Sequence, residues 1–316
     1  MPLSASFSST LGAAHDAAAA QHYPQPALYV VATPIGNLAD VTLRAVHVLQ
    51  LADAVACEDT RHTQALLRAY GIDKPPGSLL AVHQHNEADA AQSVLQRLRQ
   101  GQRVAYASDA GTPAVSDPGA RLAAAVREAG FRVVPLPGPS SVTTLLSAAG
   151  AVDDNGAFVF AGFLPAKAGE RERAVGALAA EPRAVVLLEA PHRIEALARA
   201  LQVLGARKLT VGRELTKQFE EVATLPCTGF TQWLGESPQR GRGEFALLLH
   251  PDPAAGQGNP DAERVLTLLL AELPLKTAVK LAAEITGTSR NTLYGRALQL
   301  RSGDSERGNA EEDAPQ

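Results

Sequence analysis

The chain has 316 residues, of which 46% are hydrophobic and 20% charged, a composition typical of a globular protein and not of a disordered chain or a coiled coil. It contains no apolar run of the roughly 18 residues that a membrane-spanning helix needs. It also has no CxxC pair, which excludes a disulfide scaffold and a cysteine zinc site and fits a reducing compartment. Residues 302–316 carry the formal net charge of −4, so the rest of the chain is about neutral and does not by itself indicate a nucleic-acid binder.

Both ends of the chain lack a hydrophobic pattern. Residues 1–26 are rich in Ser, Ala and Gln and contain no Lys or Arg, which argues against a secretory or mitochondrial leader. We predict a disordered extension over 1–26 and an acidic disordered tail over 302–316.

Between these ends, short apolar runs alternate with helical patterns. In residues 27–138, strands are predicted at 28–33, 54–57, 79–82, 103–107 and 131–136, and helices at 41–52, 60–70, 87–100 and 118–129. Three of these helices end at a glycine, as C-terminal caps do: Gly71, Gly101 and Gly130. This alternation predicts right-handed crossovers and a mostly parallel sheet.

A second set of elements follows the Pro/Gly-rich stretch 135–139, and we place a domain boundary near residue 138. In residues 139–250, strands are predicted at 158–163, 184–189, 208–212 and 244–249, and helices at 140–149, 170–180 and 192–204. The fold class is therefore α/β, with two α/β domains. Residues 251–260 have the composition of a linker.

Residues 261–301 form a small helical appendix, with helices predicted at 261–272, 275–286 and 289–300. Ser289 is the expected N-cap of the last helix. The last two helices fit either a helix-turn-helix or an ordinary helical hairpin, and the pattern alone favours the hairpin. The apolar positions expected to pack the hairpin are Ala278, Leu281, Ala282 and Ile285.

Ligands of parallel sheets bind where the strands end, so four post-strand loops are of interest. They are 33–37 (TPIGN), 58–63 (EDTRHT), 108–119 (SDAGTPAVSDPG) and 135–142 (PLPGPSSV). Asp117-Pro118 is explained as a helix start. A helix start does not explain the first half of the loop 108–119, where Gly111 permits close backbone approach to a ligand. Ser140 or Ser141 opens a helix, either as a plain cap or with free N–H groups for a carboxylate.

Two further polar stretches also follow strands: 189–193 (EAPHR) and 213–217 (RELTK). No GxGxxG, Walker or GxSxG motif is present. His83 and His85 lack a carboxylate at metal-site spacing, so we expect no metal.

Seven sequence motifs, taken together and in this order, are characteristic of one protein family: TPIGNLADVTLRA, CEDTRHT, SDAGTPAVSDPG, VVPLPGPSS, AGFLPAK, EAPHR and GRELTK. With them the sequence resembles the ribosomal RNA small subunit methyltransferase I family, the bacterial 16S rRNA cytidine 2′-O-methyltransferases. That family is the ribosomal branch of the tetrapyrrole-methylase-like superfamily. The resemblance covers about residues 27–301.

The resemblance implies a cytoplasmic homodimer with S-adenosylmethionine (SAM) in the cleft between the two α/β domains. It implies cofactor contacts from Pro34, Ile35, Asp109, Gly111, Thr112, Val115, Ser116, Gly138, Ser140, Ser141, Leu164 and Ala246. The Gly-Asp-Pro of the superfamily is Gly111-Thr112-Pro113 in this chain, so the aspartate contact there is absent or is replaced by Asp109.

Transfer of a methyl group to a ribose 2′-OH needs a general base, and a nearby cation stabilises the developing alkoxide. The candidate bases are Glu58, Asp59 and Glu189, with Arg61 as a charge-stabilising group, and the sequence does not rank them. The residues expected to bind the RNA of the small subunit are His62, Arg193, Lys276, Lys280 and Arg290. Two alternatives stay open: a superfamily member acting on a tetrapyrrole or a protein, and a non-catalytic ribosome-binding module.

Overall fold

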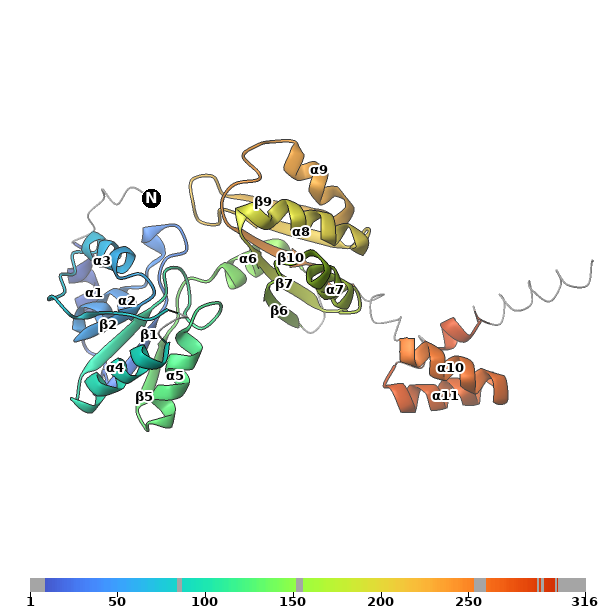
Figure 1. The fold of residues 1–316 in the computed structure, drawn as a ribbon, viewed down its shortest axis with the longest axis horizontal. Helices are drawn as coiled ribbons and strands as arrows, with labels where there is room; N and C mark the ends of the chain where they lie inside the picture. Colours follow the sequence, from blue (N-terminus) through green and yellow to red (C-terminus); the bar gives the residue numbers. More distant parts are fainter. Residues whose placement is uncertain are drawn as a thin grey trace, which may run out of the picture. The chain divides into compact units, whose positions relative to one another are not determined.

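The computed structural model describes residues 9–83, 87–151, 156–252 and 260–288, together with 290, 293–298 and 300. The chain divides into two units (Figure 1). The first contains the described residues of Met1–Gly150, Val211–Ala223 and Gly243–Ala246, and the second contains the others. The first unit thus runs on to Gly150, past the boundary expected near 138, because it keeps helix α6 (Ser141–Ala149).

The sheet of the first unit has the strand order β3-β2-β4-β1-β5, and every neighbouring pair is parallel. The predicted strands are confirmed within two residues: β1 (Ala27–Val31), β2 (Ala54–Cys57), β3 (Leu79–Ala81), β4 (Arg103–Ala107) and β5 (Arg132–Leu136). A parallel sheet must be covered on both faces, which explains why these strands read as continuous apolar runs.

Helices cover both faces of this sheet (Figure 1). On one face, helices α2 (Leu43–Leu51) and α3 (Thr60–Ala69) pack against side chains such as Tyr29 and Val55. On the other face, helices α4 (Glu87–Arg99) and α5 (Gly119–Glu128) pack against side chains such as Tyr106. All four helices were predicted. The consequence for function is that all the strands end at one edge, where their loops meet.

The prediction of a disordered extension over 1–26 was wrong for the part that the structure describes. Residues Thr10–Ala18 form helix α1, whose Ala14 and Ala18 are 0% and 2% exposed. The hydroxyl of Tyr23 donates to the Ala18 carbonyl oxygen at 3.0 Å. Two alanines at i, i+4 spacing let α1 lie close against α2, and such small side chains give no strong hydrophobic pattern in the sequence. Residues 1–8 and 302–316 lie outside the described residues.

The second sheet has the order β6-β7-β10-β8-β9. Four of its strands were predicted: β6 (Phe158–Phe163), β7 (Ala184–Glu189), β8 (Lys208–Arg213) and β10 (Phe245–Leu249). The accompanying helices α7 (Ala168–Ala179) and α8 (Ile194–Leu201) were also predicted. Strand β9 (Glu221–Pro226) and the short helix α9 (Phe230–Gly235) were missed. Strand β9 lies at the sheet edge and alternates between half-buried and exposed residues, so its pattern is weak.

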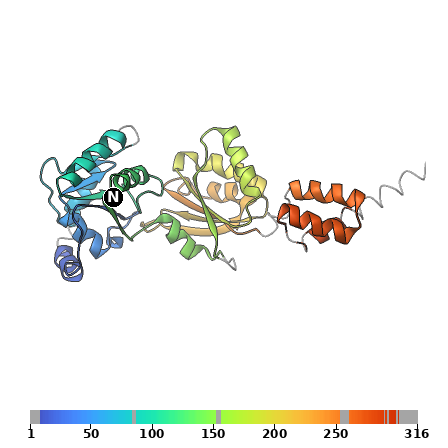
Figure 2. The same ribbon diagram turned by 90° about the horizontal axis from the view of Figure 1, so that it is seen from below.

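The appendix contains helices α10 (Pro260–Glu272) and α11 (Leu275–Thr286), which lie side by side (Figure 2), and further helical residues at 293–298. They share a core of Ala262, Leu266, Val279, Ala282, Leu293 and Ala297. Ile285 was expected to pack in it but is 64% exposed, because the buried face of α11 centres on Val279 and Ala282. The predicted N-cap Ser289 lies outside the described residues. None of the helices in the described ranges is long and apolar enough to span a membrane.

Candidate active site

The loop after β1 is fastened to the loop after β4. The backbone N–H groups of Thr33 and Gly111 each donate to the other residue's carbonyl oxygen at 3.0 Å. The Thr33 hydroxyl, which is buried, donates to the carbonyl oxygen of Ser108 at 3.1 Å. These bonds hold Pro34 and Ile35 beside the loop 108–119.

The loop after β2 joins the same edge through a reciprocal pair of hydrogen bonds. The Asp109 N–H donates to Glu58 Oε1 at 3.0 Å, and the Asp59 N–H donates to Asp109 Oδ1 at 3.2 Å. The predicted meeting of the post-strand loops at one sheet edge is confirmed for these segments, because parallel strands end on the same side.

The turn after β5 completes a cradle around Gly111. The Thr112 hydroxyl donates to the Pro139 carbonyl oxygen at 2.8 Å. Gly111 has a φ of +82°, and a Cβ there would lie 3.1 Å from Ile35 Cγ2. At Gly138 a Cβ would lie 2.7 Å from the Cβ of Ala32. Glycine is therefore required at both positions, because the three loops pack closely against one another there.

Helix α6 opens at this cradle. It begins at Ser141, and its N-cap Ser140 makes no side-chain capping hydrogen bond. The first N–H groups of the helix therefore have no partner from that side chain, as an anion-binding end requires.

Asp117 holds the second half of the loop 108–119. Its carboxylate accepts from the Tyr106 hydroxyl at 2.9 Å, from the Ala114 N–H at 2.7 Å and from the Gly119 N–H at 2.8 Å. We predicted Asp117 as the N-cap of α5, but the helix begins at Gly119 with Pro118 as its N-cap; the Asp117 carboxylate nevertheless accepts from the first N–H of the helix. Ala114 has a φ of 70°, which a residue with a side chain rarely adopts. Val115 and Ser116, which follow it, are exposed.

The charged residues of the EDTRHT segment have different environments. Burial raises the pKa of Glu58, and the neighbouring charges of Asp109 and Asp117 add to this effect although the Asp109 N–H opposes it. Asp59 instead caps α3 and pairs with Arg61, whose guanidinium Nη2 lies 3.1 Å from Asp59 Oδ2. The side-chain hydrogen bond from Arg61 lowers the pKa of Asp59. Glu58 is therefore the better base of the two.

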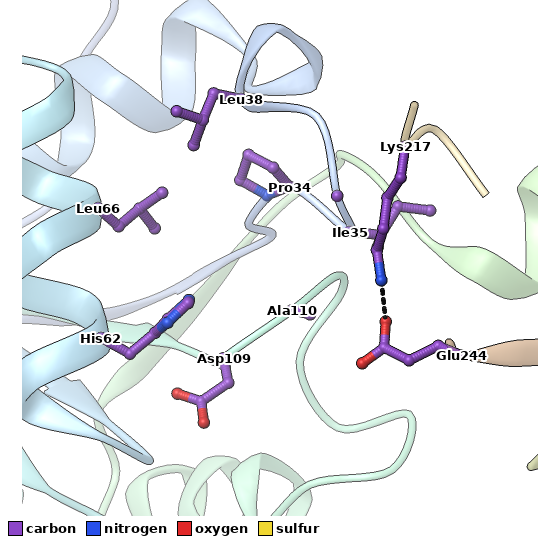
Figure 3. A pocket seen from close by; sticks show the side chains of 10 residues that line it. Pro34, Ile35, Leu38, His62, Leu66, Asp109, Ala110, Lys217 and Glu244 are labelled. Atoms are coloured by element: carbon purple, nitrogen blue, oxygen red, sulfur yellow. Dashed lines mark hydrogen bonds and ion pairs between the residues drawn. The ribbon is translucent and has the colours of Figure 1, made fainter. Parts of the chain in front are cut away.

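A pocket of about 420 Å³ opens beside these loops (Figure 3). All of its lining residues belong to the first unit: Pro34, Ile35, Gly36, Leu38, His62, Leu66, Asp109, Ala110, Lys217 and Glu244. Pro34, Ile35, Asp109 and His62 were predicted site residues. Lys217 and Glu244 were not, although the stretch 213–217 was noted as polar. Glu244 follows no sequence signal, because it comes directly before β10, at the start of a strand.

Three predicted site residues belong to the second unit and are engaged with one another. The carboxylate of Glu189 is fully buried, accepts from the Ala190 N–H at 2.9 Å and lies 3.1 Å from Arg193 Nε. The Arg193 guanidinium also donates to the Leu164 carbonyl oxygen. This ion pair ties the ends of β6 and β7 together, and it leaves Glu189 a poor candidate base. Ala246, on β10, is 3% exposed.

In the appendix, Lys276 and Lys280 are exposed on one face of α11. Arg290 is exposed as well, and its guanidinium lies 3.2 Å from Glu284 Oε1. Within the described ranges, no three His, Cys, Asp or Glu side chains gather as a metal site would require. His85 lies outside those ranges.

Comparison with known proteins identifies the family of this chain. The family model of Tetrapyrrole (Corrin/Porphyrin) Methylases matches residues 27–228, and that of the RsmI C-terminal HTH domain matches 256–301. The second match favours the helix-turn-helix interpretation of the appendix over the ordinary hairpin that the pattern favoured.

The chain is 48% identical over 278 residues to the ribosomal RNA small subunit methyltransferase I of Escherichia coli O157:H7, covering 87% of this chain and 96% of that protein. It is 46% identical over 282 residues to the protein of the same name in Pseudomonas aeruginosa, covering 86% and 96%. The X-ray structure of a cobalt precorrin-4 methyltransferase, 17% identical, gives a TM-score of 0.51 over 71% of this chain and 94% of that chain, which supports the fold. The chain therefore belongs to the tetrapyrrole methylase family, in the branch of the ribosomal RNA small subunit methyltransferase I proteins.

Proposed function

We propose that this protein is a SAM-dependent methyltransferase that methylates the ribose 2′-OH of a cytidine in the 16S rRNA of the small ribosomal subunit. The observation that carries the proposal is the glycine cradle at Gly111, built from three post-strand loops in a chain whose relatives are named as methyltransferases of this RNA.

The cradle suits a cofactor with an amino-acid end and a nucleoside. Gly111 and Gly138 let the loops after β1, β4 and β5 pack closely together, the first turn of α6 offers N–H groups to a carboxylate, and Asp109 supplies an acceptor. Gly111, Thr112, Gly138, Ser140 and Ser141 are the residues we assign to its binding, with Pro34, Ile35, Val115 and Ser116 around them. Leu164 and Ala246 stay predicted cofactor contacts. When bound, SAM supplies an electrophilic methyl group and leaves as the neutral thioether.

Glu58 is the residue we assign as general base. Its raised pKa makes it a stronger base than an ordinary carboxylate, while Asp59 and Glu189 are each held by an arginine. The 2′-OH proton passes to the Glu58 carboxylate as the hydroxyl oxygen forms its bond to the methyl carbon. Such a base contributes about 10²–10⁴-fold to the rate.

The RNA contacts are assigned to two surfaces. His62 lines the pocket of the first unit, and Arg61 beside it has a side chain that is 90% exposed. Lys276 and Lys280 present two positive charges on one face of the helix-turn-helix appendix, with Arg290 on the helix that follows. Arg193, bound to Glu189 and Leu164, serves to hold its loop instead. We further propose that the protein acts in the cytoplasm, as a homodimer.

The test is methylation of purified small subunits with labelled SAM, combined with calorimetry of SAM binding. The parent is expected to bind SAM and transfer label to 16S rRNA. Glu58→Gln should keep its SAM affinity within about twofold and lose about 10²–10⁴-fold in single-turnover rate. Glu128→Gln, an exposed carboxylate on α5, is the control and should behave as the parent does.

SAM binding without transfer to ribosomal RNA would favour another methyl acceptor, such as a tetrapyrrole or a protein. Failure to bind SAM would remove every methyltransferase interpretation and leave a non-catalytic ribosome-binding module.

A further inference from the structure

An ion pair lies in the wall of the pocket of the first unit. The Lys217 ammonium lies 2.8 Å from Glu214 Oε1 and 2.8 Å from Glu244 Oε2 (Figure 3 shows the contact with Glu244). Burial by itself would lower the pKa of Lys217, but the hydrogen bonds with Glu214 and Glu244 outweigh it and raise that pKa. The side chain therefore stays charged, with one of its three N–H groups beyond these two bonds.

The backbone around Lys217 is fixed in an uncommon conformation. Glu214 and Thr216 have φ values of 50° and 66°, in the left-handed region that residues with side chains rarely adopt. The Lys217 side chain passes so close to Gly36 that a Cβ there would lie 2.5 Å from Lys217 Cγ. Such strain is typical of sites where a side chain must be held in place for a ligand.

The carboxylate of Glu244 is bound to Lys217 but remains largely exposed. Its backbone N–H donates to Glu214 Oε1 at 2.9 Å, while its side chain is 72% exposed and bound to Lys217 through Oε2. Its carboxylate therefore has acceptor capacity to offer a ligand in the pocket.

The rest of the pocket suits a flat ring. Pro34, Ile35, Leu38 and Leu66 give it apolar walls, and His62 and Asp109 add polar groups to its lining (Figure 3). Its volume of about 420 Å³ is within the range for small-ligand sites. Apolar side chains are what flipped-out bases stack on in enzymes that modify nucleic acids.

The ion pair presents an acceptor and a donor 2.8 Å apart, as Glu244 Oε2 and Lys217 Nζ. The Watson–Crick edge of cytosine has the complementary order, with an amino donor at N4 beside acceptors at N3 and O2. Carboxylates recognise the cytosine N4 amino group in this way elsewhere. Uracil has a carbonyl oxygen in place of that amino group, so the same carboxylate would repel it.

We propose that the Lys217–Glu244 pair reads the base of the target nucleotide, with Glu244 accepting from the cytosine N4 amino group and Lys217 donating to N3 or O2. This inference rests on the proposed function, which supplies a cytidine substrate. The adenine of SAM also carries an amino group beside a ring nitrogen acceptor, so the test must separate these two sources of the same chemistry.

The experiment compares small subunits that carry cytidine or uridine at the target position. The enzymes are the parent, Glu244→Gln, Glu244→Ala and Glu195→Gln, and each is first shown to melt as the parent does. Glu195 is a matched control, because its side chain is 76% exposed and lies 3.7 Å from an arginine on its own helix. Loss of one paired contact to a base corresponds to a decrease of about 5–150-fold in the discrimination between cytidine and uridine.

The expected result is a parent with a high ratio of kcat/KM for cytidine over uridine. In both Glu244 variants that ratio should fall by about 5–150-fold, with the Kd for SAM unchanged. Glu195→Gln should retain the parent's ratio. An unchanged ratio in the Glu244 variants overturns the inference. So does a loss confined to the Kd for SAM, which would assign the pair to adenine.

A binding arm keeps the inference distinct from the proposed function. Fluorescence anisotropy with short RNAs carrying the cytidine or the uridine, in the presence of S-adenosylhomocysteine, measures base preference without any transfer. If the parent methylates no ribosomal RNA, the proposed function fails. Equal affinity of the parent for the two RNAs overturns the inference, whatever the result of the methylation assay. A preference for cytidine that Glu244→Gln removes would support the inference.

Discussion

Replacing Asp117 should loosen the loop 108–119, and the effect should depend on Tyr106. The Tyr106 ring is fully buried under the loop, and its hydroxyl donates to Asp117 Oδ1 at 2.9 Å. Burial, together with the charge of Asp117, raises the pKa of Tyr106, so the hydroxyl stays protonated as a donor. The perturbation is a double-mutant cycle of Asp117→Ala and Tyr106→Phe.

The size of each effect follows from the contacts. Asp117→Ala removes the acceptor for the Gly119 N–H at the start of α5, worth about 1 kcal/mol. It also leaves the buried Tyr106 hydroxyl without a partner, at a cost of about 1–3 kcal/mol. Tyr106→Phe alone removes one hydrogen bond to a charged group, worth about 1.5–3 kcal/mol. In the double variant no hydroxyl is left unpaired, so its cost should be smaller than the two single costs combined by at least about 1 kcal/mol.

The free energies of unfolding are measured by urea denaturation followed by far-ultraviolet circular dichroism, and SAM affinity by calorimetry. Asp117→Ala should weaken SAM binding by about tenfold or more, since about 1.4 kcal/mol of loop ordering corresponds to that factor. Strictly additive destabilisation, or unchanged SAM affinity in Asp117→Ala, would refute the role of Asp117 in shaping the loop.

Three further predictions follow from the same structure. The raised pKa of Glu58 means that its contribution to stability is present below the ordinary value of 4.5 and is lost as pH rises through the folded-state pKa. Glu58→Gln should therefore be at least as stable as the parent at neutral pH, with a flatter pH profile in denaturant titrations; a less stable variant at neutral pH would contradict this. Replacing both Lys276 and Lys280 with alanine should reduce the slope of log affinity for RNA against log salt concentration by about 1–2 and leave SAM affinity intact. An unchanged slope would show that these lysines do not contact RNA phosphates. Ala14→Asp places a charge in the buried contact between α1 and α2, and should lower the free energy of unfolding by several kcal/mol, whereas Ala13→Asp at the exposed neighbouring position should have a much smaller effect.

Much of the site was predictable because the fold class dictates where it lies. The apolar runs at 54–57 and 103–107 predict buried strands, and parallel strands bring the loops after them to one edge. The contact between Glu58 and Asp109, 51 positions apart in the chain, is a consequence of that topology. The Gly and Pro content of 108–119 predicts a loop of fixed shape.

What could not be predicted depends on packing between distant segments. Helix α1 is held by the small contacts of Ala14 and Ala18, which produce no hydrophobic stripe. Lys217 reaches the pocket because Glu214 and Thr216, which are not glycine, adopt the left-handed backbone conformation. Glu244 precedes β10, and its position depends on the place of that strand in the order of the second sheet. Neither feature has a local signature. The ion pair between Glu189 and Arg193 could not be predicted for the same reason, because only the fold brings the two side chains together.

Methylation of one ribose of small-subunit RNA by this chain can be tested by identifying the methylated product. Small subunits lacking the modification are incubated with the protein and labelled SAM, and the RNA is digested to nucleosides and mapped by mass spectrometry. We expect label in 2′-O-methylcytidine at a single position of 16S rRNA, and with Glu58→Gln this label should form about 10²–10⁴-fold more slowly. Label on a base, on a ribosomal protein or on no component of the subunit would contradict it.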